Sequence, residues 1–258
     1  EARLLLVRVD YVEGEPETYL LPVAFAEGER AERAISDWPD SIVTRLQYAG
    51  RDRTGVIYEA TANRDFLRVL VEGLARRRKF KGAAGQLAAV PTEMFRKLRG
   101  KGALEPSVLR SDQSNTSVVY GDRMIMKLVR RPYAGLAPDM EIGRFLNTHA
   151  PHVSTPRVAG YLEYQRRRAE PITLAIIQEY VHNEGDAWNY SLDVATTFFE
   201  QVTSRSATET LHPALPEVSL LDLMHQEPPP LARELMGGYL QSAELLGKRT
   251  GELHVALG

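Results

Sequence analysis

Lys127 is the residue with the clearest chemical potential, because it interrupts an apolar run at residues 124–129. On a β-strand it would share a face with Ile125 and Val129, so its ammonium group would point where water is scarce. A lysine in a strand is ordinarily an edge residue, or one whose side chain reaches back to water. A partly desolvated lysine needs an anion instead, and the nearest candidate along the chain is Glu141.

Glu141 lies in residues 139–146, where a carboxylate borders the apolar stripe of a short predicted helix with Pro138 in its first turn. A strand lysine paired with a helix glutamate is the arrangement that kinase-type folds use to hold the α- and β-phosphates of ATP. We therefore expect Lys127 and Glu141 to form an ion pair, at roughly 3 to 4 Å, when a nucleotide is bound.

Five predicted strands and one helix would position this pair. Residues 106–110, 116–120 and the Lys127 strand form a meander, and the helix that carries Glu141 follows. Residues 156–164 and 172–181 then indicate two further strands. Five strands with one helix inserted after the third is the small lobe of a kinase-like fold, so the predicted fold class is α+β.

The remaining segments predict two flanking parts. A hairpin, two short strands and a helix capped by Asn63 form an α+β module, and the glycines at 82–85 indicate a flexible exit from it. Helical patterns, one of them beginning at Ser191, fill the last part of the chain. We expect an N-terminal cap domain at residues 1–105, a kinase-like N-lobe with a five-stranded sheet at 106–182, and the start of a helical C-lobe at 183–258.

Composition narrows the range of partners. The chain of 258 residues is 43% hydrophobic and carries a formal net charge of −2, which supplies no overall field for nucleic acid or an anionic membrane. The basic runs at 76–79 and 166–168 are interpreted as solvated surface. No stretch approaches the ~20 apolar residues of a membrane span. The absence of cysteine excludes disulfides and thiolate chemistry, and a cytoplasmic location fits it.

Several ordered motifs resemble bacterial maltokinase. They are residues 113–117 (QSNTS), the Lys127 strand, 139–146 (DMEIGRFL), 178–181 (QEYV) and 183–188 (NEGDAW). The resemblance implies a fold like that of the eukaryotic protein kinases and aminoglycoside phosphotransferases, with a distinctive N-terminal cap. It also implies phosphorylation of maltose to maltose 1-phosphate with ATP and Mg²⁺, and an association with trehalose synthase, to which the family is often fused.

The resemblance also implies roles for individual residues. Lys127 would contact the α- and β-phosphates, and Glu141 would hold it in place. A loop at 111–115 would cover the phosphates, and a hinge at 178–181 would meet adenine through backbone groups, although turn chemistry and a buried strand end also explain these two segments. The implied ATP-binding residues are Lys127, Glu141, Ser111, Gln113, Ser114, Asn115, Gln178, Glu179, Tyr180 and Val181.

The chain departs from the family in one respect that matters for activity. Phosphoryl transfer needs a residue that positions the attacking hydroxyl and ligands for Mg²⁺, and kinase folds supply them from a His-Gly-Asp-like loop and a later acidic motif. Neither motif is present. Residues 251–258 resemble the helix just before that loop, in which His254 is expected to be a packed helix residue. We therefore expect an internal piece of a kinase, inactive alone, with its catalytic residues and Mg²⁺ ligands outside the chain.

Two other functions stay open at this point. One is a catalytically inactive binding or scaffold module that serves trehalose synthase. The other is a related small-molecule kinase with a different acceptor, such as another sugar, an aminoglycoside or choline. A hydrolase is not expected, because the sequence contains no Gly-x-Ser-x-Gly elbow, no cysteine and no His-Glu-x-x-His motif.

Overall fold

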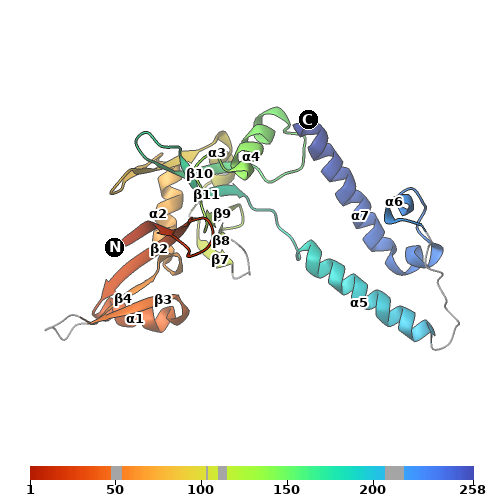
Figure 1. Cartoon of the computed structure of the whole chain (residues 1–258), viewed down its shortest axis with the longest axis horizontal. Coiled ribbons are helices and arrows are strands. Elements are labelled where there is room, and N and C mark those ends of the chain that lie inside the picture. Colours follow the sequence, from red (N-terminus) through yellow and green to blue (C-terminus); the bar gives the residue numbers. More distant parts are fainter. Residues whose placement is uncertain (48–53, 103, 110–114, 207–217) are drawn as a thin grey trace. The chain divides into compact units, whose positions relative to one another are not determined.

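A computed structural model describes residues 1–47, 54–102, 104–109, 115–206 and 218–258 (Figure 1). The chain forms two compact units. The first comprises Glu1–Pro151 and Thr155–Val181, and the second comprises His152–Ser154 and His182–Gly258. The boundary between these units is not the domain boundary expected near residue 105. A domain boundary at that position stays a prediction.

The first unit opens with a four-stranded antiparallel sheet. The hairpin predicted from the polar turn is present, and helix α1 covers one face of the sheet because small side chains allow a close approach. Ala31 and Ala34 of α1 pack there against Ala24, Ala26 and Val56. In sheet order the strands are β1 (Ala2–Val9), β2 (Glu17–Glu27), β4 (Thr54–Glu59) and β3 (Ile42–Gln47), with α1 (Glu29–Asp37) and a short helix η1 (Pro39–Ser41) between β2 and β3.

The second sheet of this unit has seven antiparallel strands in the order β5-β6-β10-β11-β9-β8-β7. The five strands expected between residues 106 and 182 are all part of it. They are β7 (Pro106–Leu109), β8 (Asn115–Tyr120), β9 (Met124–Val129), β10 (Val158–Gln165) and β11 (Ile172–Glu179).

The expectation of a five-stranded sheet was wrong, because β5 (Lys79–Lys81) and β6 (Gln86–Pro91) extend it. The segment around Gly85, interpreted as a flexible exit, is the turn between these two strands. β6 pairs with β10 along six residues and so satisfies backbone groups that would otherwise form an open edge. A glycine is needed at position 85, where a Cβ atom would lie 2.4 Å from the carbonyl oxygen of Gln165.

One face of the seven-stranded sheet holds the main hydrophobic core. Helix α2 (Arg64–Ala75), which follows a short helix η2 (Ala60–Ala62), lays an apolar stripe including Leu67 on this face. Its N-terminus is capped as expected, since the Asn63 side chain accepts hydrogen bonds from the first turn. The hydroxyl of Tyr120 in β8 donates a hydrogen bond of 2.9 Å to the carbonyl of Leu67, and burial raises the pKa of Tyr120. Residues on both sides of position 105 therefore share this core.

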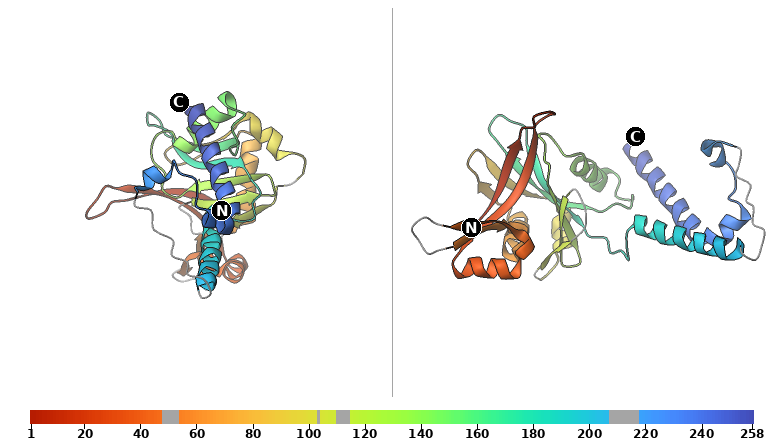
Figure 2. Two further views of the ribbon diagram at one scale, coloured as in Figure 1. Left: turned by 90° about the vertical axis from the view of Figure 1, so that its right-hand side faces the viewer. Right: turned by 60° about the horizontal axis from the view of Figure 1, so that its bottom comes forward.

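Helix α4 (Pro138–His149) packs on the other face through Met140, which contacts Val158, Tyr161 and Ile176. Helix α3 (Glu93–Arg99) begins at Thr92, whose hydroxyl accepts a hydrogen bond from the backbone of Met94. Figure 2 shows two further views of these helices and the sheet.

The second unit is helical in its described part. Its helices are α5 (Ala187–Ser206), α6 (Leu220–Leu223) and α7 (Pro230–Leu257). Helix α5 begins four residues before Ser191, the expected cap, because the Asp186 carboxylate accepts a hydrogen bond of 2.8 Å from the backbone of Asn189. His254, expected to be packed, is exposed on α7. None of the helices in the described ranges is both long and apolar enough to cross a membrane.

Candidate functional site

Lys127 lies in the interior of the seven-stranded sheet, on the face that α4 covers. Strand register places it directly between Ile176 of β11 and Ser117 of β8. Because directly paired residues of antiparallel strands point to the same side, the three side chains share one face. Ile176 and Ser117 are buried and Lys127 is half-buried. The lysine therefore stands at the border between an apolar surface and solvent, and is not on an edge strand.

Helix α4 approaches this face very closely. A Cβ atom at Gly143 would lie 2.3 Å from a methyl group of Val158, so the helix could not sit at this depth with a side chain there. The guanidinium carbon of Arg144 lies 5.8 Å from the ring centre of Tyr161, within the range of a cation–π contact. These contacts fix the orientation of α4 over the sheet.

Glu141 follows Met140, the residue that anchors α4 on Ile176, and its side chain is exposed. Glu141 is thus next in the chain to the residue that packs on Ile176, and Ile176 pairs with Lys127. Among the described residues they do not approach within the 4.0 Å of an ion pair. The expected pair belongs to the nucleotide-bound state and stays a prediction.

The expected phosphate loop is only partly described. Ser111, Gln113 and Ser114 lie outside the described residues. Asn115 is the first residue of β8, half-buried and paired with Val129 of β9. Asn115 lies two residues before Ser117, the partner of Lys127, and residues two apart on a strand share a side. The Asn115 side chain therefore points to the same face as Lys127.

The expected hinge is the end of β11 and the residues that follow it. Gln178 pairs with Ile125 and lies in the sheet, whereas Val181 is exposed. The backbone N–H of Glu179 donates to the carbonyl of Arg157, and the N–H of Tyr180 donates to the carbonyl of Arg123, each at 2.8 Å. These two N–H groups are already occupied. Each backbone carbonyl oxygen of the segment has two lone pairs, and one of them could accept a hydrogen bond from a purine amino group.

Two residues near this site were missed in the sequence reasoning. Ser117 lies directly beside Lys127, and the register of the β8–β9 hairpin around its Gly121 turn is the signal that would have found it. Arg157 lies beside Glu179, with one guanidinium nitrogen buried and without a partner in the described part of the chain. A buried donor without an acceptor costs free energy, so this nitrogen is a candidate for contact with a ligand.

The described residues form no cluster of three or more histidine, aspartate or glutamate side chains that could hold a metal ion. The face around Lys127 supplies one cation and the half-buried amide of Asn115, with the buried Ser117 beside the lysine. That set suits the binding of anionic oxygen atoms.

Comparison with known proteins places these features in context. No protein-family model matches the chain. Among solved structures, the chain is similar to a glucosamine kinase in complex with glucosamine, ADP and inorganic phosphate, with 16% sequence identity and a TM-score of 0.47. The match covers 100% of this chain and 46% of that kinase.

Two crystal forms of glucosamine kinase, B and A, are similar at 17% identity, with TM-scores of 0.44 and 0.42. Each match covers 99% of this chain and 45% of the kinase, so the chain spans less than half the length of these proteins. At this identity and TM-score the similarity decides neither the fold nor the function of the chain.

Proposed function

We propose that residues 1–258 form the nucleotide-binding part of a small-molecule kinase that phosphorylates a sugar. The observation that carries the proposal is the position of Lys127, half-buried in an inner strand and facing the one helix inserted after the third strand of the meander. A cation held there is partly desolvated and pre-organised, which strengthens its interaction with a phosphate oxygen. Edge lysines, which water screens, lack this property.

The proposed ligand is ATP. Lys127 would bind its α- and β-phosphate oxygens, and Glu141 would swing toward Lys127 to fix the ammonium group. Asn115 and the rest of the loop at 111–115 would cover the phosphates, and the segment at 178–181 would contact adenine. ATP supplies the transferred phosphoryl group, and these residues bind and orient it.

The proposed acceptor is maltose, on the motif resemblance to bacterial maltokinase. Glucosamine is a second acceptor to test, because it is bound in one of the structurally similar kinases. We further propose that the Mg²⁺ ligands and the residue that positions the acceptor hydroxyl are supplied from outside residues 1–258. Orienting ATP without them leaves most of the barrier to phosphoryl transfer in place.

The test combines two proteins and two acceptors. The chain 1–258, and a longer protein that adds the helical lobe expected after it, are each incubated with ATP, Mg²⁺ and either maltose or glucosamine. Product is detected by phosphorus NMR. Maltose 1-phosphate from the longer protein alone is the expected result. Product from 1–258 at a similar rate would contradict the placement of the catalytic groups, and a glucosamine phosphate without maltose 1-phosphate would contradict the acceptor.

A pair of variants of the longer protein tests the role of Lys127. Lys127→Met keeps the length of the side chain and removes its charge, so phosphoryl transfer should fall by about 10²-fold or more with little change in stability. Lys97→Met, on the exposed side of α3, is the matched control and should leave turnover unchanged. Near-normal turnover by Lys127→Met would refute the phosphate-binding role.

The alternative is an inactive module that binds trehalose synthase. ATP binding without turnover by the longer protein would favour this module, whereas the kinase proposal requires both product and ATP binding that Lys127→Met weakens. Co-purification with trehalose synthase, with no product from the longer protein, would favour the scaffold.

A further inference from the structure

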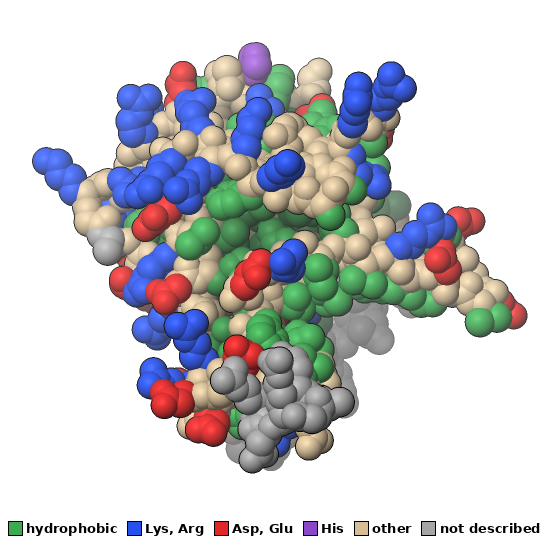
Figure 3. Space-filling model, turned by 90° about the vertical axis from the view of Figure 1, so that its left-hand side faces the viewer, with side chains coloured by type: hydrophobic (Ala, Val, Ile, Leu, Met, Phe, Trp, Pro, Cys, Tyr) green, Lys and Arg blue, Asp and Glu red, His purple; other side chains and the backbone are tan. Residues whose placement is uncertain are grey.

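A basic hollow of about 560 Å³ lies at the β5–β6 end of the seven-stranded sheet. Its rim carries four cations, Lys79, Lys81, Arg166 and Arg167, and its floor carries Gln86 and Gln165. Lys79, Arg166 and Arg167 belong to the two basic runs that were interpreted as solvated surface, and Lys81 follows the first of these runs. Figure 3 shows lysine and arginine side chains gathered on the upper part of the face it presents.

Strand pairing builds the floor of the hollow. Gln86 of β6 pairs with both Lys81 of β5 and Gln165 of β10, so the three side chains point to one side. The Gln86 amide donates a hydrogen bond of 3.1 Å to Gln165, and the Gln165 amide donates one of 2.7 Å to Glu163. The side chains of the floor are therefore held in place by one another, and the amide of Gln86 retains a further N–H to offer.

No carboxylate of the described residues lies within ion-pair distance of the rim cations, although Glu163 shares their face of the sheet, because it pairs with Ala88, which pairs with Lys79. In the described part of the chain none of the four rim cations has a carboxylate within 4.0 Å, whereas nearby Arg76 has Glu72 at 3.9 Å. The whole chain carries a formal charge of −2, so this cluster is not a consequence of a generally basic composition. All four cations are exposed, so water screens part of their mutual repulsion, and a bound anion would offset the rest.

The backbone beside the hollow also retains arginine where glycine would be favoured. Arg77, just after α2, has φ 50°, and Arg168, in the β10–β11 turn, has φ 58°. Both values lie in the left-handed region, which costs free energy for a residue with a Cβ atom. Neither Arg77 nor Arg168 lines the hollow itself.

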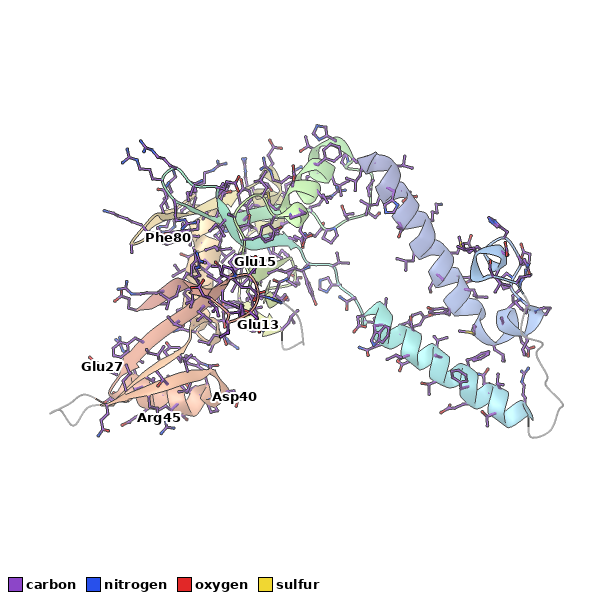
Figure 4. All side chains as sticks on the ribbon, in the orientation of Figure 1. Glu13, Glu15, Glu27, Asp40, Arg45 and Phe80 are labelled. Carbon is purple, nitrogen blue, oxygen red and sulfur yellow. The ribbon has the colours of Figure 1, made fainter. Side chains whose placement is uncertain are left out.

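We propose that this hollow is a binding site for a small oligophosphate anion, a molecule carrying two or three phosphate groups in a row. Its groups are donors suited to phosphate oxygens, and its open side would leave part of a charged ligand in water. A single-stranded nucleic acid is disfavoured, because it needs exposed aromatic rings on which bases can stack. Phe80 (Figure 4) instead packs against α2, where its ring would lie 3.2 Å from a Cβ atom at Gly73.

The experiment is a calorimetric titration of the chain 1–258 with inorganic tripolyphosphate in low and in moderate salt. We expect saturable binding at one site that weakens as salt rises. The double variant Lys81→Gln/Arg167→Gln should raise the Kd at least tenfold. The matched control Arg96→Gln/Lys97→Gln removes the same charge from exposed positions on α3 and should change the Kd less than twofold. Circular dichroism melts verify that each variant is folded.

Lys127→Met separates this site from the nucleotide site, on which the proposal does not depend. Tripolyphosphate binding that survives Lys127→Met and is lost in the hollow variant supports the proposal. Binding lost in Lys127→Met alone would assign the anion to the nucleotide site and overturn it. Equal losses in the hollow and control variants, or no binding at all, would also overturn it. A 20-nucleotide single strand that binds tenfold more tightly than tripolyphosphate, and loses binding in the hollow variant, would assign the surface to nucleic acid instead.

Discussion

Gly143→Ala is expected to destabilise the first unit, although the same substitution in an exposed helix usually stabilises. Alanine gains about 1 kcal/mol over glycine in a helix interior. At Gly143, however, the new methyl group would lie 2.3 Å from Val158, which is fully buried and cannot rotate away freely. Overpacking of this kind costs about 2 to 3 kcal/mol, so the free energy of unfolding should fall by about 1 to 2 kcal/mol.

The assay is urea unfolding followed by tryptophan fluorescence. The chain has two tryptophans, so a Trp188→Phe background leaves Trp38 to report on the first unit. Gly247→Ala in α7 is the control, because nothing lies within 4 Å of its Cβ position. Unfolding of this control is followed by circular dichroism, and its free energy of unfolding should rise by about 0.5 to 1 kcal/mol.

A double-mutant cycle locates the cause. In a Val158→Ala background the clashing methyl group is absent, so Gly143→Ala should become neutral or stabilising. If Gly143→Ala stabilises the chain with Val158 intact, by as much as Gly247→Ala does in α7, then α4 does not lie against β10 at the described depth. The reasoning about the face that carries Lys127 would then fail.

Three further outcomes are expected. Tyr120→Phe should lower the free energy of unfolding by about 0.5 to 1.5 kcal/mol in urea titrations, because it removes a buried hydrogen bond to α2; no change would show that the bond contributes nothing. The hydrogen bond from Tyr19, and to a smaller extent the one from Arg131, lowers the pKa of Glu17 from 4.5 to about 2. The ionised Glu17 therefore stabilises the folded state fully above pH 4.5, and this stabilisation is lost as the pH falls toward 2. Glu17→Gln should weaken the dependence of the free energy of unfolding on pH between 4.5 and 2. An unchanged dependence would argue against a stabilising role of Glu17. Limited trypsin digestion should cut first near residue 105, after the exposed Lys101, or within residues 79–85, and a first cut between residues 128 and 180 would contradict the predicted division of the chain.

The sequence alone indicated the local elements around the site. The apolar run at 124–129 is a property of neighbouring residues, so Lys127 could be assigned to a strand without knowledge of its partners. The Asn63 cap and Pro138 at the start of α4 are equally local signals. Gly143 stood in the quoted motif, but its reason, the approach of α4 to Val158, became visible only in the fold.

Pairing between distant segments was decided only in the tertiary structure. Gln86 and Gln165 are 79 residues apart, and nothing in either segment specifies that β6 pairs with β10. For the same reason the sequence showed neither the seven-stranded sheet nor the core shared across residue 105. Strand register places Ser117 beside Lys127 and brings two basic runs together at one hollow. Register is fixed by the burial of a whole face of the sheet and not by any single residue.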